Sequence, residues 1–246
     1  MPKAKVKSAY VCQECGAEHA KWQGQCHACG EWNSLSRVTI SPVAGSATSH
    51  QALGFAGVEA QIQKLSEVEA LDTARIGSGF NELDRVLGGG FVPGSVVLIG
   101  GDPGAGKSTL LLQACTKLAT DHGVLYVTGE ESLQQLALRA KRLKLPMDGL
   151  SVAAETRAEV IASHIAAQKP QVVVLDSVQV LQMEGLDSTP GSVTQVRETA
   201  AFFTRLAKQQ DVVIILVGHI TKEGGLAGPK VLEHVIDCFM MLDSPA

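Results

Sequence analysis

The chain has 246 residues, of which 45% are hydrophobic, and this length suits one sizeable α/β domain together with a small additional module. Its formal net charge of −4 excludes an overall basic field, so any nucleic-acid site has to be built from local groups. No run approaches the roughly 18 apolar residues of a membrane span, and the basic start lacks the apolar core of a secretory signal, so we expect a cytoplasmic protein with no membrane contact and with reduced thiols.

Four of the six cysteines lie near the N-terminus with the spacing C-x2-C-x10-C-x2-C. Two such pairs in a short polar segment are typical of a tetrahedral four-thiolate site, which suits structural Zn²⁺. A redox-active dithiol is the alternative, and His19 or His27 could replace a ligand, but the complete set of cysteines favours zinc and surface histidines. The expected zinc ligands are Cys12, Cys15, Cys26 and Cys29. Cys115 and Cys238 lie among apolar residues and are expected to be small core residues.

The domain boundaries follow from changes in composition. We expect residues 1–40 to form a zinc ribbon, a C4-type zinc finger, and residues 41–72 to form a linker rich in Ser, Ala, Gly and Thr. A short helix is predicted at residues 58–70 within that linker. Residues 73–246 are expected to form the larger domain, whose first helix is predicted at residues 81–87.

A phosphate-binding motif follows. Residues 101–108 read G-D-P-G-A-G-K-S and match G-x-x-x-x-G-K-[ST] at every fixed position, between a predicted strand at 96–100 and a helical pattern at 110–118. In this context the backbone N–H groups of the loop and the N-terminus of the helix bind phosphate oxygens. We expect Lys107 to contact the terminal phosphates and Ser108 to ligate Mg²⁺. The motif predicts ATP as the nucleotide, bound by Gly101, Asp102, Pro103, Gly104, Ala105, Gly106, Lys107, Ser108 and Thr109.

Apolar runs and helical periodicity predict the remaining elements of the larger domain. Helices are expected at residues 133–143 and 157–168, and strands at residues 124–128, 172–177 and 212–217. A continuous apolar strand such as the one at 172–177 is buried on both faces, which implies a parallel sheet. The expected fold is therefore α/β, a P-loop ATPase with a mostly parallel central sheet, preceded by the zinc ribbon.

Acidic residues end two of these strands. Asp176 is expected beside the phosphate loop, where it can hold Mg²⁺, although an Asp in this place can also cap a helix. Glu130 and Glu131 follow the strand at 124–128, and one of them is expected to be the general base that deprotonates the attacking water. The alternative is that both begin the next helix, where acids are favoured. We favour Glu130, which makes Lys107 and Glu130 the expected catalytic residues.

Two polar loops, at residues 183–195 and 219–230, are expected at the carboxyl edge of the sheet. Loops rich in glycine at this edge are usually functional. His219, Thr221 and Lys222 are placed to sense the terminal phosphate.

A DNA contact is expected to depend on a few local cations. The candidates are Arg197, Lys222 and Lys230, and beside the ribbon Lys3, Lys5, Lys7 and Lys21. On charge alone, however, the lysines of the second loop are better explained as incidental residues of a solvated loop.

The chain resembles the RadA (Sms) family of bacterial DNA repair proteins over essentially its whole length. The resemblance is carried by K-W-x-G-x-C and G-E-W-N-S-L in the ribbon, followed by G-D-P-G-A-G-K-S-T, T-G-E-E-S, V-L-D-S-V-Q and G-H-I-T-K-E-G-x-L-A-G-P-K-V-L-E-H. The family continues with a K-N-R-F-G segment and a domain similar to that of the Lon protease. This chain ends at Ala246 before both.

The resemblance implies a RecA-type ATPase that forms homo-hexameric rings and drives branch migration of recombination intermediates in a helicase-like way. Single-stranded or branched DNA, and recombinase or helicase proteins, are the implied partners. It matches Gly101–Ser108 to the nucleotide loop, the four N-terminal cysteines to the zinc ligands, Glu130 to the catalytic acid and Asp176 to the Mg²⁺-site acid. The segment after His219 matches a DNA-facing loop.

Two other functions remain open at this point. An ATP-dependent phosphotransferase on a RecA-type core also carries adjacent glutamates after its second strand, but a zinc ribbon argues against it. A nonenzymatic adaptor, in which the ribbon binds a partner and nucleotide only stabilises the fold, would not need Lys107, Asp176 and Glu130 together.

Overall fold

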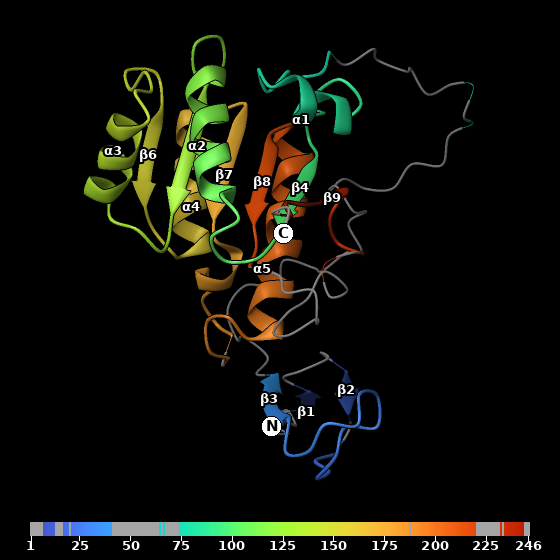
Figure 1. The fold of residues 1–246 in the computed structure, drawn as a ribbon. Coiled ribbons are helices and arrows are strands. Elements are labelled where there is room, and N and C mark those ends of the chain that lie inside the picture. The colour runs from blue at the N-terminus through green and yellow to red at the C-terminus, as the bar shows by residue number, and fades with distance from the viewer. Residues whose placement is uncertain are drawn as a thin grey trace.

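The computed structural model describes two separate sheets (Figure 1). It covers residues 7–12, 17–19, 21–40, 64, 66, 74–186, 188–219, 232 and 234–243. The predicted helix at 58–70 therefore falls almost entirely outside the described residues, as do Lys222 and Lys230.

The first sheet is small and antiparallel. Its strands are β1 (Lys7–Cys12), β2 (Glu18–His19) and β3 (Leu35–Ile40), in the order β2-β1-β3. The apolar cluster here consists of Cys12, Cys26 and Leu35, with Tyr10 and Ala17 packed against it. So small a core among the described residues buries little apolar surface, so we expect a bound metal to supply most of the folding free energy of this sheet. A zinc-ribbon fold at the N-terminus was predicted, and this is confirmed.

The second sheet has six strands in the order β6-β5-β7-β8-β4-β9, and all of its strand pairs are parallel. The strands are β4 (Val96–Gly100), β5 (Val124–Thr128), β6 (Ser151–Ala154), β7 (Val172–Asp176), β8 (Val213–Val217) and β9 (Cys238–Met241). The helices are α1 (Asn81–Val86), α2 (Lys107–Leu118), α3 (Leu133–Arg142), α4 (Ala158–Gln168) and α5 (Val193–Gln210), with a 3-10 turn, η2 (Val178–Val180).

Helices cover both faces of this sheet (Figure 1). Helices α2 and α3 pack on one face and α4 and α5 on the other, because alternate strand residues point to opposite faces. In β5, for example, Tyr126 belongs to the α2/α3 core and Val127 to the α4/α5 core. The strands β4, β5, β7 and β8 are buried throughout, as their continuous apolar runs predicted. The predicted RecA-like α/β fold with a parallel sheet is confirmed.

Most predicted elements lie within one or two residues of their observed bounds, but two of the bounds need correction. The loop expected at residues 183–195 ends earlier, because Ser192 accepts a hydrogen bond from the backbone N–H of Gln195 and so caps α5, which begins at Val193. Helix α2 begins at Lys107, earlier than the helical pattern predicted at residues 110–118. The strands β6 and β9 and most of α5 were not anticipated.

The two cysteines outside the ribbon differ in burial. Cys115 is completely buried in α2, as expected, and burial raises the pKa of its thiol. Cys238 is only half-buried in the edge strand β9, so it is less enclosed than the prediction of a core residue implied.

Within the described part of the chain, no helix combines the length and the apolar content needed to cross a bilayer.

Candidate functional site

The phosphate loop connects β4 to α2 and is shaped by glycines. Gly104 and Gly106 have φ values of 85° and 90°, a region that side chains rarely adopt, and no described atom lies within 4 Å of a Cβ built at either position. Gly101 has φ of 149°, and a Cβ there would collide with the backbone carbonyl oxygen of Leu242. Beside the loop lies a cavity of about 190 Å³. The glycines thus leave open space where backbone N–H groups can surround a phosphate.

Lys107 begins α2 and is only 4% exposed. Its ammonium donates to the carbonyl oxygens of Gly101, at 2.7 Å, and Asp102, at 2.9 Å, which leaves one of its three N–H groups for a ligand. Burial lowers the pKa of Lys107, and the carboxylates of Asp176, Asp102 and Glu130 oppose that shift. Lys107 also lines the cavity, so its ammonium can contact a phosphate bound there.

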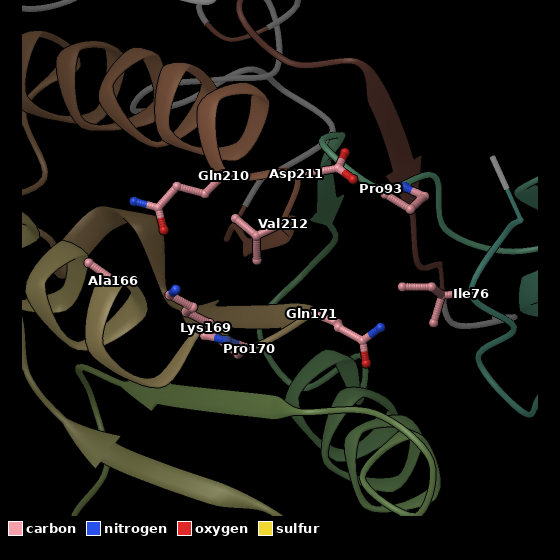
Figure 2. A pocket seen from close by; sticks show the side chains of 9 residues that line it. All are labelled: Ile76, Pro93, Ala166, Lys169, Pro170, Gln171, Gln210, Asp211 and Val212. Atoms are coloured by element: carbon pink, nitrogen blue, oxygen red, sulfur yellow. The ribbon is translucent and has the colours of Figure 1, made fainter. Parts of the chain in front are cut away.

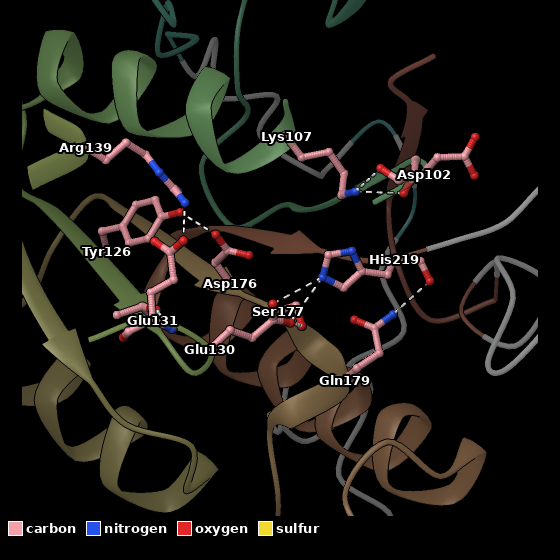
Figure 3. Close-up of polar contacts among 12 residues, drawn as sticks. Asp102, Lys107, Tyr126, Glu130, Glu131, Arg139, Asp176, Ser177, Gln179 and His219 are labelled. Atoms are coloured by element: carbon pink, nitrogen blue, oxygen red, sulfur yellow. Dashed lines mark hydrogen bonds and ion pairs between the residues drawn. The ribbon is translucent and has the colours of Figure 1, made fainter. Parts of the chain in front are cut away.

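Asp176 ends β7 and is 8% exposed. The hydroxyl of Tyr126 donates to its Oδ2 at 2.5 Å (Figure 3). Among the described residues, no donor was found for Oδ1. The pKa of Tyr126 is raised well above its usual value, mainly by burial and secondly by the negative charge of Asp176. The phenol therefore stays protonated and keeps its hydrogen for the carboxylate.

Glu130 lies at the end of β5, where two side chains contact its carboxylate (Figure 3). The hydroxyl of Ser177 donates to Oε1, and Nε2 of His219 lies 3.1 Å from the same oxygen. The backbone carbonyl of His219 accepts from the Gln179 side chain at 3.3 Å. The segment after β8 therefore contacts Glu130 through His219.

Glu131 has a different environment. Its carboxylate pairs with the guanidinium of Arg139 from α3, and its backbone N–H donates to the hydroxyl of Thr128. Arg139 also lines the cavity beside the phosphate loop, and its Nη1 is buried with no hydrogen-bond partner among the described residues. The two adjacent glutamates therefore face different partners: Glu130 faces Ser177 and His219, and Glu131 faces an arginine.

The site residues fit a magnesium nucleotide. Mg²⁺ prefers oxygen ligands, and the Ser108 hydroxyl and Oδ1 of Asp176 are oxygen donors at this edge of the sheet. The open space at Gly104 and Gly106, with the ammonium of Lys107 beside it, suits phosphate. Sequence reasoning did not single out Tyr126, Ser177 or Arg139. Tyr126 lies in the middle of β5, Ser177 follows β7 directly, and Arg139 lies on α3.

The ribbon gathers the cysteines that the structure describes. The sulfur atoms of Cys12, Cys26 and Cys29 lie within 4.8 Å of one another, a donor set that fits zinc. Nε2 of His19 lies 3.4 Å from Sγ of Cys26, so this histidine is closer to the thiolates than the expected surface position implied. Cys15, the fourth predicted ligand, lies outside the described residues.

The predicted DNA contacts are described only in part. Arg197 lies in α5 and pairs with Glu198 at 3.0 Å, and Lys21 is exposed in the ribbon. Lys3, Lys5, Lys222, Lys230 and Thr221 lie outside the described residues, and only the backbone of Lys7 is described.

A second cavity, of about 630 Å³, lies at the opposite edge of the sheet (Figure 2). It is formed by the segments that precede β4, β7 and β8, and its charged residues are Lys169 and Asp211. None of the predicted site residues that the structure describes lines it.

Comparisons with known proteins agree with the sequence motifs. Residues 62–225 match the family described as AAA domain, and residues 10–37 match the rubredoxin metal binding domain. A DNA repair protein RadA of Haemophilus influenzae is 56% identical over 98% of this chain and 52% of its own length. Its counterpart from Escherichia coli is 54% identical over 98% of this chain and 53% of its own length. The counterpart from Listeria monocytogenes is 45% identical over 99% of this chain and 52% of its own length. The chain thus spans about half the length of these relatives, and the predicted resemblance is confirmed.

Proposed function

The chain belongs to the AAA domain family, and from this premise we propose that it hydrolyses ATP to drive a motor on DNA in recombinational repair. The observation that carries the proposal is that Lys107, which lines the cavity beside the phosphate loop, lies close enough to Asp176 and Glu130 for their charges to act on its ammonium. A protein that only bound nucleotide would need the lysine and the loop, but not a carboxylate beside them to accept a proton.

Each residue has a role in the proposed reaction. The loop and Lys107 bind the β- and γ-phosphates and stabilise the charge that develops during transfer. Mg²⁺, bound through Ser108 and Asp176, would neutralise further phosphate charge. Glu130 accepts a proton from the attacking water, and the hydroxyl of Ser177 orients its carboxylate.

His219 is proposed to connect the nucleotide to DNA. Its side chain contacts Glu130, and the segment that follows it carries Lys222 and Lys230, which we propose as DNA contacts together with Arg197. A bound DNA strand that moved this segment would also move His219 relative to Glu130. DNA binding would then change the rate of hydrolysis.

The wider function rests on the relatives. Because they are named as DNA repair proteins, we propose DNA as the partner of this chain, with branch migration as the process. A homo-hexameric ring, contacts with a recombinase or helicase, and a cytoplasmic location remain proposals. So do the domain boundaries at residues 40 and 72.

The test is ATP turnover by the purified chain with and without single-stranded DNA. We expect turnover to rise when DNA is added. If the chain turns over ATP at the same rate with and without DNA and binds no DNA, the motor proposal fails. Transfer of the γ-phosphate to a protein side chain instead of water would favour the phosphotransferase. Nucleotide binding without turnover would favour the adaptor.

A further inference from the structure

Tyr126 is a buried residue of β5 whose hydroxyl makes a hydrogen bond. It is fully enclosed in the α2/α3 core, yet its hydroxyl has one partner, Oδ2 of Asp176, at 2.5 Å. A tyrosine in the middle of a buried apolar strand has to satisfy its hydroxyl, and here the acceptor is the acid at the end of the neighbouring strand.

The register of the sheet explains the contact. Thr128 lies opposite Asp176 in the parallel pairing of β5 with β7, and Tyr126 lies opposite Val174. Side chains two residues apart in a strand share a face, so Tyr126 and Asp176 are diagonal neighbours on the α2/α3 face. The long side chain of Tyr126 reaches across this diagonal and brings its hydroxyl to Asp176.

We propose that Tyr126 is a positioning residue that fixes the carboxylate of Asp176, so that Oδ1 faces the magnesium site beside Ser108. This proposal rests on the proposed nucleotide site. With Oδ2 engaged by the phenol, rotation of the carboxylate about its last bond breaks a hydrogen bond in a buried place. Oδ1 of Asp176 is then the oxygen that can bind the metal ion.

The groups around Tyr126 favour the hydrogen bond from its hydroxyl to Asp176. The carboxylate of Asp176 offers only acceptors, so in this contact the hydroxyl of Tyr126 is the donor. The guanidinium of Arg139 is paired with the carboxylate of Glu131. Figure 3 shows these four side chains close together beside α2.

The consequence concerns metal affinity. Groups that hydrogen-bond a metal ligand typically change metal affinity by about 10- to 100-fold when they are removed. Tyr126→Phe deletes one oxygen, keeps the ring, and leaves the phosphate loop untouched. It should therefore weaken metal binding without weakening metal-free nucleotide binding.

The experiment measures Mn²⁺ binding by electron paramagnetic resonance, with a nonhydrolysable ATP analogue at saturation. Tyr10→Phe is the matched control, because the chain has only 2 tyrosines and Tyr10 lies in the ribbon. We expect Mn²⁺ affinity to fall about 10- to 100-fold in Tyr126→Phe and to stay unchanged in Tyr10→Phe. Analogue binding in excess chelator should be equal in all three proteins. Equal Mn²⁺ affinity in folded Tyr126→Phe and wild type would overturn the proposal.

A second measurement decides the case if Tyr126→Phe does not fold. The Tyr10→Phe chain grown with 3-fluorotyrosine carries a single fluorinated ring, at Tyr126. We expect its ¹⁹F resonance to shift when Mg²⁺ is added to the analogue-bound protein, and an unchanged resonance would overturn the proposal. A wild-type chain that binds the metal–nucleotide pair but does not hydrolyse ATP would refute the proposed function and leave the role of Tyr126 standing.

Discussion

Glu130→Gln separates hydrolysis from nucleotide binding. Glutamine keeps the length of the side chain and an oxygen that can accept the hydrogen bond from Ser177, but its amide cannot take a proton from water. General-base catalysis contributes roughly 100- to 10,000-fold, so turnover should fall by that factor, which corresponds to about 3 to 5 kcal/mol of activation free energy. Because Lys107 and the loop are unchanged, ATP should still bind.

The assay is phosphate release at saturating Mg²⁺ and ATP, with binding of a fluorescent ATP analogue measured in parallel. Glu131→Gln is the matched control, because it makes the same chemical change at the adjacent residue. Its carboxylate pairs with Arg139, and glutamine keeps an oxygen that can accept from that guanidinium. Turnover of the control should stay within about threefold of wild type, since Glu131 is not proposed to take the proton.

The reasoning fails if the two variants behave the other way round. A large loss in Glu131→Gln with normal turnover in Glu130→Gln would move the base by one residue. It would also remove the proposed connection from His219 to hydrolysis, because His219 contacts Glu130.

Three further predictions concern other parts of the chain. Metal analysis should find about one Zn²⁺ per chain, and Cys26→Ser should lose it and unfold the ribbon while the thermal unfolding of the ATPase domain stays unchanged; a ribbon that stays folded without metal would contradict this. The side chain of Arg157 lowers the pKa of Glu155 to about 2, so the stability that Glu155 contributes is fully present above its unfolded pKa near 4.5 and is lost as the pH falls toward 2. Glu155→Gln should therefore lower the unfolding temperature at pH 7, and the difference from wild type should shrink steadily when the measurement is repeated below pH 4.5. Replacing Lys222 and Lys230 by alanine should weaken single-stranded DNA binding and reduce its salt slope by about 1.4, two contacts at about 0.7 each; an unchanged slope in a salt titration would exclude these lysines as contacts.

Much of the larger domain could be predicted because its signals are local. The runs that form β4, β5, β7 and β8 are continuously apolar, and the glycine loop lies at the junction of a strand and a helix. Asp176 at the end of β7 and the acids just after β5 lie at one edge of the sheet because parallel strands end together. For these residues the order along the chain already determines their neighbours in space.

The missed elements lack such local signals. The edge strand β6 is four residues long and mostly exposed, so it has no apolar run, and β9 is equally short. The start of α5 depends on a cap by Ser192 within a polar segment that reads as a loop.

The missed site residues depend on pairing between distant segments. Tyr126 reaches Asp176 only through the register of β5 against β7, and Ser177 meets Glu130 in the same way. Arg139 meets Glu131 because α3 turns its side chain toward the sheet. No spacing in the sequence indicates these contacts, since each one requires the positions of two elements to be known.

The most direct test of the account is phosphate release by Lys107→Ala. The variant removes the ammonium beside the loop, where it donates to the carbonyls of Gly101 and Asp102, and leaves the strands and both apolar cores intact. The account predicts a folded chain with no measurable ATP hydrolysis, against clear turnover in wild type measured in parallel. A folded Lys107→Ala chain that releases phosphate at the wild-type rate would contradict the assignment of this site as the place of hydrolysis.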